Sequence, residues 1–242
     1  MFPLRDHNPS RRTPYVTYAI LALNVLVFLV MLPARGSPAD IGAIYVTYGL
    51  VPAATEPMDF ITSLFMHGGW MHLIGNMLFL WIFGDNMEDE LGHFGFIAFY
   101  LAAGVLASLA HVAIEPTSRV PLVGASGAIA GLMGGYLLLF PKAKVDVIFI
   151  FVVFFKIWPI PAWIVLGVWF GLQLLNGASN GVGAGVAYWA HVGGFVAGIL
   201  MILPVWLREG GTEFWSRNEG HPPHPDATYR RTTIPVIPRK RT

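Results

Sequence analysis

The sequence predicts an all-α membrane protein, a polytopic helical bundle of six transmembrane helices over residues 15–207. Hydrophobic residues make up 55% of the chain and charged residues only 12%, whereas soluble domains carry about a quarter charged residues. The mean hydropathy is +0.60. The apolar residues also gather in long stretches without Lys, Arg, Asp or Glu. Composition and charge patterning therefore both indicate a chain that crosses a bilayer several times.

The charge-free stretches define the individual spans. A helix needs about 20 apolar residues to cross the hydrocarbon core, and the last stretch is long enough for two such helices. The turn-rich segment 176–183 divides it, which predicts helices near 158–175 and 186–206 and six spans in total. The stretches are residues 15–32, 60–84, 94–114, 120–141 and 157–207.

The first stretch resembles a signal peptide because Arg5, Arg11 and Arg12 precede it. It is longer than a usual signal-peptide core of roughly 7–15 residues. Pro33-Ala34-Arg35 follows it, and this is not a small-x-small cleavage site. We therefore expect a short N-terminal segment, residues 1–14, and an uncleaved first transmembrane helix.

Two segments do not fit the pattern of spans. Residues 145–155 are rich in Val, Ile and Phe, but they include Asp146 and are too few to cross as a helix. We expect them to form an interfacial or partly embedded connection that ends at Trp158-Pro159-Ile160-Pro161. From about Arg208 onward the chain is polar and rich in proline, so residues 208–242 are expected to be a disordered cytoplasmic tail.

Positively charged residues predict the orientation, because cytoplasmic loops carry an excess of Lys and Arg. With six spans, both termini lie on one side of the membrane. That side holds most of the basic residues, and the other side holds Arg35 and Arg119. We therefore expect an integral multi-pass protein of a bacterial inner membrane with both termini in the cytoplasm. The basic residues assigned to the cytoplasmic side are Arg5, Arg11, Arg12, Lys142, Lys144 and those of the tail.

Three polar side chains inside separate spans are predicted to lie at one depth. Counted from the cytoplasmic ends at 1.5 Å per residue, His72, Ser126 and His191 lie at heights of about 20, 22 and 24 Å. Polar groups at membrane depth are costly and usually functional. A serine and a histidine form the minimal pair of nucleophile and general base. We therefore expect a shared catalytic site toward the outer leaflet.

Small residues beside this pair allow the helices to approach each other. Gly127 and Gly131 form one GxxxG pair, and Gly194 and Gly198 form a second one on the helix face of His191. Such pairs let membrane helices pack backbone to backbone. Packing alone is the alternative interpretation, but a Ser and a His directly beside both pairs favour a catalytic role.

The chemistry requires further groups around the catalytic pair. No Asp or Glu lies in the membrane near His191, so the sequence predicts a dyad, and Tyr188, Trp189 or backbone packing are alternatives for holding its ring. Attack on a carbonyl creates an oxyanion, which needs preset donors. His72 and Asn76 share a helix face and, with the backbone N–H of the serine, are expected to supply them.

Several other polar residues are interpreted one by one. For His67, a structural role and a role in lining the site are equally favoured. His111 is expected to be structural. Gln173 and Asn24 are expected to form interhelical hydrogen bonds. Glu88 is expected to tie the acidic loop after the second span to a neighbouring helix.

The motifs around the catalytic pair resemble those of the rhomboid family of intramembrane serine proteases. The family's GxSG motif matches Gly124-Ala125-Ser126-Gly127. Its last-helix histidine with following glycines matches His191, Gly194 and Gly198. The resemblance covers roughly residues 52–203 and implies the serine of this motif as nucleophile and His191 as general base.

The second span carries further family motifs. The pattern of two histidines and an asparagine matches His67, His72 and Asn76, and the Glu and Gly that follow this helix match Glu88 and Gly92. Together with the catalytic motifs they make the resemblance highly specific.

One family landmark is missing. Many members carry a Trp-Arg pair in the first loop, and the aligned positions here are Met58-Asp59. The catalytic assignment does not depend on this pair. The resemblance implies an endopeptidase in the lipid bilayer that cleaves transmembrane segments of single-span membrane-protein substrates near the outer membrane face, without a cofactor or a metal.

Other functions fit less well. The net charge of +1 gives no reason to expect a nucleic-acid partner, and the lack of Cys excludes a thiolate zinc site or a Cys nucleophile. A metalloprotease would need an HExxH pattern, which the sequence lacks. An aspartyl intramembrane protease needs two aspartates in the membrane, and Asp85 has no second aspartate to pair with there. The main alternative is a non-catalytic rhomboid-like protein that binds membrane clients, but such relatives typically lack the Ser or the His. A small-solute transporter is disfavoured because paired membrane charges and inverted repeats are not visible.

Overall fold

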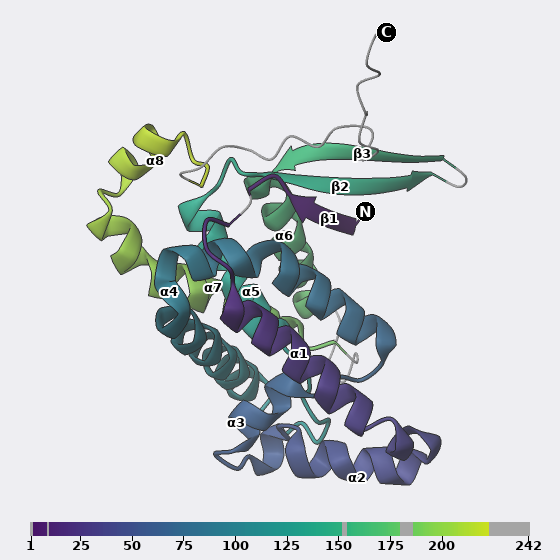
Figure 1. Cartoon of the computed structure of the whole chain (residues 1–242). Helices are drawn as coiled ribbons and strands as arrows, with labels where there is room; N and C mark the ends of the chain where they lie inside the picture. The colour runs from purple at the N-terminus through teal and green to yellow at the C-terminus, as the bar shows by residue number, and fades with distance from the viewer. Residues whose placement is uncertain (1, 9, 152–153, 180–185, 223–242) are drawn as a thin grey trace, which may run out of the picture.

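The structure is a computed structural model that describes residues 2–8, 10–151, 154–179 and 186–222. Five apolar helices form a bundle, with α2 and α3 at one end and a small sheet at the other (Figure 1). The helices are α1 (Tyr15–Val30), α2 (Pro38–Tyr48), α3 (Asp59–Thr62), α4 (Trp70–Ile114), α5 (Ser126–Leu139), α6 (Ala162–Ser179), α7 (Tyr188–Arg208) and α8 (Thr212–Asn218), with short 3-10 turns at Pro33–Gly36, Pro52–Ala54 and Ser63–Phe65.

Helix α4 contains the third predicted span and residues 70–84 of the second, whose first residues lie instead in α3, a 3-10 turn and the loop before α4. It is interrupted at Gly92, whose φ of 66° and ψ of 166° are not helical. Glycine adopts a positive φ without the steric cost that other residues incur, and α4 turns back on itself at this point (Figure 1). Among the described residues, α4, α6 and α7 are long and apolar enough to cross a membrane, and α1 and α5 are shorter apolar helices. The chain is therefore a membrane protein by length and composition, while the number of six spans stays a prediction.

Helix α5 lies between α4 and α7 and is buried along most of its length. A Cβ atom at Gly131 would lie 2.5 Å from the Cβ of Ala103 in α4. One at Gly134 would lie 2.1 Å from the backbone oxygen of Phe195 in α7. Larger residues would clash at both places, so the glycines bring the three helices into backbone contact.

The fold is mostly helical, but the expected all-α class is wrong in one region. Strands β1 (Phe2–Asp6), β2 (Lys144–Phe151) and β3 (Phe154–Pro161) form an antiparallel sheet in the order β1-β2-β3. Within the run 145–155, the described residues 145–151 and 154–155 belong to β2 and β3, because β-branched and aromatic side chains favour extended backbone. The predicted helix near 158–175 therefore begins later, at Ala162.

The N-terminal segment is part of this sheet. Arg5 pairs with Asp146 across β1 and β2, and its Nε donates to the Asp146 carboxylate over 2.8 Å. The imidazole of His7 lies 2.7 Å from the other carboxylate oxygen. These contacts attach the start of the chain to the hairpin between α5 and α6.

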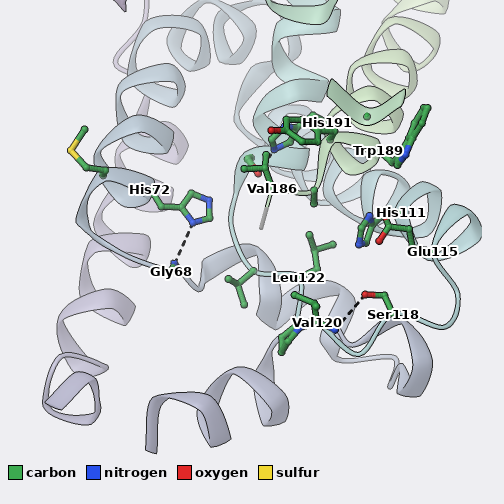
Figure 2. A pocket seen from close by; sticks show the side chains of 17 residues that line it. Gly68, His72, His111, Glu115, Ser118, Val120, Leu122, Val186, Trp189 and His191 are labelled. Carbon is green, nitrogen blue, oxygen red and sulfur yellow. Dashed lines mark hydrogen bonds between the residues drawn. The ribbon is translucent and has the colours of Figure 1, made fainter. Parts of the chain in front are cut away.

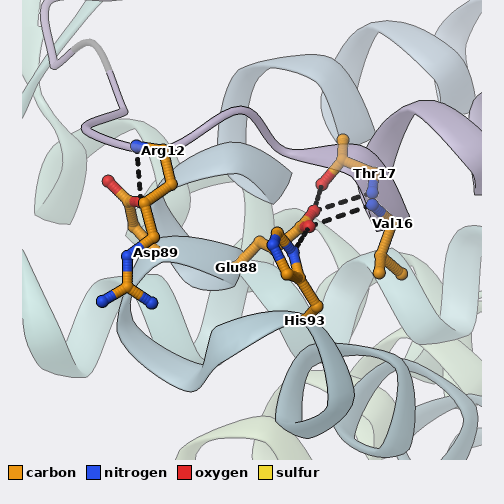
Figure 3. Close-up of polar contacts among 6 residues, drawn as sticks. All are labelled: Arg12, Val16, Thr17, Glu88, Asp89 and His93. Carbon is orange, nitrogen blue, oxygen red and sulfur yellow. Dashed lines mark hydrogen bonds and ion pairs between the residues drawn. The ribbon is translucent and has the colours of Figure 1, made fainter.

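Glu88 fastens α1 to α4 (Figure 3). Its carboxylate accepts hydrogen bonds from the backbone N–H groups of Val16 and Thr17 over 2.9 and 2.7 Å, and from the Thr17 hydroxyl over 2.7 Å. The first N–H groups of a helix have no partner within it, and a negative charge at a helix N-terminus is favourable. The prediction that Glu88 ties this region to a neighbouring helix is confirmed. Asp89 beside it accepts from the backbone N–H of Arg12 over 3.0 Å.

Part of the stretch expected to be disordered is helical. In α8, the Phe214 side chain is buried and its ring centroid lies 6.4 Å from that of Phe140. Trp215 donates from Nε1 to the backbone oxygen of Leu138 over 2.9 Å. These aromatic residues cover the end of α5, which explains why a short polar segment is held there. Residues 223–242 of the predicted tail lie outside the described residues.

Candidate active site

Ser126 and His191 meet at the end of the bundle that lies opposite the sheet. Ser126 is the first residue of α5, and His191 lies in the first turn of α7. The Oγ of Ser126 is 2.8 Å from Nε2 of His191. His72 lies in the first turn of α4, at the same end of the helices. The three residues predicted to share one depth therefore lie close together.

Four glycines allow this approach of α5 and α7. A Cβ atom at Gly194 would lie 2.2 Å from the backbone oxygen of Gly127, and one at Gly198 would lie 1.9 Å from that of Gly131. Real Cβ atoms do not come this close, so the two GxxxG pairs hold the backbones in direct contact. The contact lies immediately beside Ser126 and His191.

Gly124 creates the space for an imidazole next to the serine. Its φ is +129°, in the region that glycine alone adopts easily. A Cβ atom there would lie 2.7 Å from both Cε1 and Nε2 of His72. The His72 ring thus lies against the backbone of Gly124, and the loop is fixed by a bond from the Gly124 N–H to the Ser63 oxygen over 2.9 Å.

The hydrogen bonds of His72 determine which of its nitrogens carries the proton. Nδ1 accepts from the backbone N–H of Gly68 over 3.2 Å (Figure 2). In a neutral imidazole the proton is then on Nε2, the nitrogen that lies toward Gly124. Asn76 donates one N–H of its amide to the backbone oxygen of His72 over 2.8 Å. The two side chains line a cavity of about 200 Å³ together with Ser126 and His191.

A larger cavity of about 590 Å³ leads to the same pair of residues. Its polar lining includes His111, Glu115 and Ser118, which are labelled in Figure 2. His111, which was expected to be structural, lies in the wall of this cavity. The cavity supplies room for water beside Ser126.

Gln173 in α6 holds the second nitrogen of His191. Its Oε1 lies 2.8 Å from Nδ1 of the imidazole. An amide oxygen can only accept, so the proton of neutral His191 lies on Nδ1 and Nε2 is free to accept from the serine hydroxyl. The Trp169 ring, with its centroid 5.8 Å from that of His191, lies beside the imidazole.

The sequence interpretation missed this role of Gln173. It predicted an interhelical hydrogen bond there without naming His191, and it considered Tyr188 and Trp189 for holding the ring. A signal was present, since Gln173 lies about 17 Å above Ala162 at 1.5 Å per residue. That height approaches those of the three residues already assigned to the site.

His67 supports the site from the loop before α4. Its side chain is completely buried, and its ring centroid lies 5.2 Å from that of His72 in an edge-on arrangement. Its backbone oxygen accepts from the hydroxyl of Tyr45 over 3.0 Å and also from the Arg35 guanidinium. Arg35 further donates to the Gly68 oxygen over 3.0 Å. Residues from the first loop thus hold the loop that orients His72.

The positions aligned with the family's Trp-Arg pair lie apart from these contacts. Met58 is exposed, and Asp59 in α3 accepts from the backbone N–H of Glu56 over 2.9 Å. Arg35, not Met58-Asp59, therefore connects the first loop to the site in this chain.

Comparison with known proteins agrees with the geometry. A family model described as a Rhomboid domain matches residues 54–208. Rhomboid protein 1, mitochondrial, of Saccharomyces cerevisiae is 32% identical over 197 residues, which are 76% of this chain and 51% of that protein. The Rhomboid protease GluP of Bacillus subtilis is 29% identical over 202 residues, 82% of this chain and 36% of that protein. A putative rhomboid protease of the same organism, YdcA, is 35% identical over 128 residues, 52% of this chain and 63% of that protein.

The chain spans about half the length of the yeast relative and less of GluP. The domain model, however, covers more than half of this chain. It includes Ser126, His191, His72, Asn76 and Gln173, whereas Arg35 and Tyr45 lie before it. The resemblance in the motifs is confirmed, and the chain belongs to the rhomboid family.

Proposed function

We propose that this protein is an intramembrane serine endopeptidase that cleaves transmembrane segments of membrane-protein substrates near the outer membrane face. The observation that carries the proposal is the chain of hydrogen bonds from Gln173 through His191 to Ser126. Each of its two links is 2.8 Å long. A serine aligned with an oriented general base is the arrangement needed for nucleophilic catalysis.

The first step is attack by the Oγ of Ser126 on the scissile carbonyl carbon. His191 removes the hydroxyl proton with Nε2, and the imidazolium that forms is stabilised at Nδ1 by the Gln173 oxygen. The negative oxygen of the tetrahedral intermediate requires donors that are already in position. The Nε2–H of His72, the remaining amide N–H of Asn76 and the backbone N–H of Ser126 are suited to this role.

The start of α5 adds to this oxyanion site. The Ser126 N–H belongs to the first turn, where backbone donors have no helical partner and point out of the helix end. The helix dipole favours negative charge at the same place. Collapse of the intermediate transfers the proton from His191 to the leaving amine. Water that enters through the larger cavity then hydrolyses the acyl-enzyme by the same steps in reverse.

The membrane arrangement is proposed as six spans with the catalytic end toward the outside. The excess of Arg and Lys near the sheet end supports the placement of both termini in the cytoplasm of a bacterial cell. The site lies at the ends of α4, α5 and α7 opposite that surface. Single-span proteins in the same bilayer are the proposed substrates.

The test compares purified wild type with Ser126→Ala and His191→Ala in liposomes. Wild type is expected to cleave a generic single-span reporter and to react with a fluorophosphonate probe, whereas both variants lose both activities. Unchanged thermal unfolding shows that the variants are folded. Full activity of folded Ser126→Ala contradicts the proposal. A wild type that binds the reporter but neither cleaves it nor reacts with the probe supports a non-catalytic client-binding protein instead.

A further inference from the structure

The hairpin of β2 and β3 has two faces of different composition. Residues that pair across antiparallel strands project to the same side of a sheet, and successive residues alternate between the sides. One face carries the pairs Val145 with Ile160, Val147 with Trp158, and Phe149 with Lys156. The other carries the pairs Lys144 with Pro161, Asp146 with Pro159, and Ile148 with Ile157. We call these the apolar face and the polar face.

The apolar face begins as part of the helix-bundle core. Val145 and Val147 are both 0% exposed and pack with the buried residues of the bundle. Farther along the same face, Phe149 is partly buried and its ring centroid lies 5.2 Å from that of Trp158. Trp158 itself is 43% exposed. The face that covers the helices at the base of the hairpin thus continues outward as an aromatic surface beyond them.

A cationic side chain accompanies this aromatic surface. The Nζ of Lys156 lies 4.7 Å from the centroid of the Trp158 ring, and Lys156 is exposed. The polar face has a different character, because Asp146 on it is hydrogen-bonded to Arg5 and His7 of the N-terminal segment. Ion pairs of this kind suit water, whereas an exposed Trp with a neighbouring Lys suits a boundary between lipid and water.

The position of the hairpin agrees with such a boundary. Strands β2 and β3 lie across the ends of the helices and do not continue their direction (Figure 1). Because the neighbouring apolar helices cross the bilayer, the plane at their ends is the membrane surface. Trp and Tyr concentrate in that zone, and Lys side chains reach from it to lipid headgroups. The hairpin joins α6 directly, since Ala162 follows Pro161 without a linker.

We propose that the β2–β3 hairpin lies in the lipid interface of the leaflet opposite the active site, with its apolar face toward the acyl chains. Phe149 and Trp158 contact lipid below the headgroups, and Lys156 contacts the headgroup phosphates. The polar face is in water. The hairpin thereby fixes the inner end of α6 at the membrane surface. This placement depends on the membrane location of the chain and not on its catalytic activity.

The chain contains no cysteine, so single cysteines can carry a reporter group without further changes. Trp158→Cys and Ile157→Cys are a matched pair, because the two residues are adjacent, both 43% exposed, and on opposite faces. Each variant is labelled with an environment-sensitive NBD fluorophore and reconstituted into liposomes of phosphatidylethanolamine and phosphatidylglycerol. Quenching by nitroxide-labelled lipid is compared with quenching by aqueous iodide.

The expected result is a several-fold preference for the lipid quencher at position 158 and for iodide at position 157. Lys156→Cys retains Trp158 and provides a second probe of the apolar face, where lipid quenching by a headgroup-level nitroxide is expected. Equal quenching of positions 157 and 158 by iodide overturns the proposal. So does protection of position 158 from both quenchers, because that result means that protein, such as a second copy of the chain, covers this face.

Discussion

Replacing Gln173 by methionine removes the oxygen next to His191 and keeps a side chain of similar length. The Oε1 atom lies 2.8 Å from Nδ1 of an imidazole that becomes cationic when it takes the serine proton. Hydrogen bonds to charged groups contribute about 1.5–3 kcal/mol. Because about 1.4 kcal/mol corresponds to a factor of ten in rate, we expect kcat to fall roughly 10- to 150-fold in Gln173→Met.

The assay measures kcat and KM with a single-span reporter, and the rate of fluorophosphonate labelling, in liposomes. KM is expected to change little, because Gln173 lies at the nitrogen of His191 that is turned away from Ser126. Gln173→Glu should recover much of the rate, since either protonation state of a carboxyl group retains an oxygen that accepts from Nδ1. Leu172→Met on the exposed side of α6 is the matched control and should behave as wild type.

Two results would refute the reasoning about Gln173. Wild-type labelling of Gln173→Met would show that the hydrogen bond does not orient the base. An equal loss in Gln173→Met and Gln173→Glu would show that the residue contributes through packing and not through its acceptor oxygen.

The other predictions concern the oxyanion site, the helix contact and the N-terminal segment. Asn76→Ala should lower kcat more than it raises KM, by up to about 10²–10³-fold; a change confined to KM would assign Asn76 to packing. Gly194→Ala should lower the rate of fluorophosphonate labelling about 100-fold, because its Cβ would lie 2.2 Å from a backbone oxygen of α5 and a displacement of about 1 Å can lower the rate by that factor. Gly167→Ala is the control, because the space around Gly167 is open. Equal labelling rates for the two variants would argue against close contact between α5 and α7. Burial, followed by repulsion from the Asp85 carboxylate, raises the pKa of Asp6 from 3.8 to about 8. The folded state then retains a proton that the unfolded state releases, so this contribution to stability declines between about pH 4 and about pH 8. Asp6→Asn should therefore lose less thermal stability than wild type as pH rises through this range. Identical pH profiles of thermal stability for the two proteins would contradict this prediction.

Helix geometry allowed the proximity of Ser126 and His191 to be predicted from the sequence. A helix rises 1.5 Å per residue, so the position of a residue within a charge-free stretch becomes a height in the membrane. Ser126, His191 and His72 could be assigned to one level in this way. The glycines beside them indicated close approach, because only a residue without a side chain permits backbone contact. Both the depth of these residues and the close approach of their helices can be inferred from residue positions along each helix alone.

The sequence did not predict which helices are neighbours or which face each helix turns toward its neighbour. Gln173 bonds to His191 because α6 presents that side to α7, and its spacing within α6 does not specify which neighbour it faces. The role of Arg35 in holding the loop at Gly68 has the same origin, because the two residues come together only when the first loop folds against α4.

The sheet shows most clearly what tertiary structure decides. The sequence predicts an interfacial or partly embedded connection for the apolar run 145–155, because its length excludes a spanning helix; it does not show that this run contains strand. Pairing with β1 and contact of Val145 and Val147 with the helix ends select the strand. In general, spacing along one helix is a local property that the covalent chain determines. The partner that a side chain meets depends on free-energy differences between whole packing arrangements, which arise only when the elements assemble.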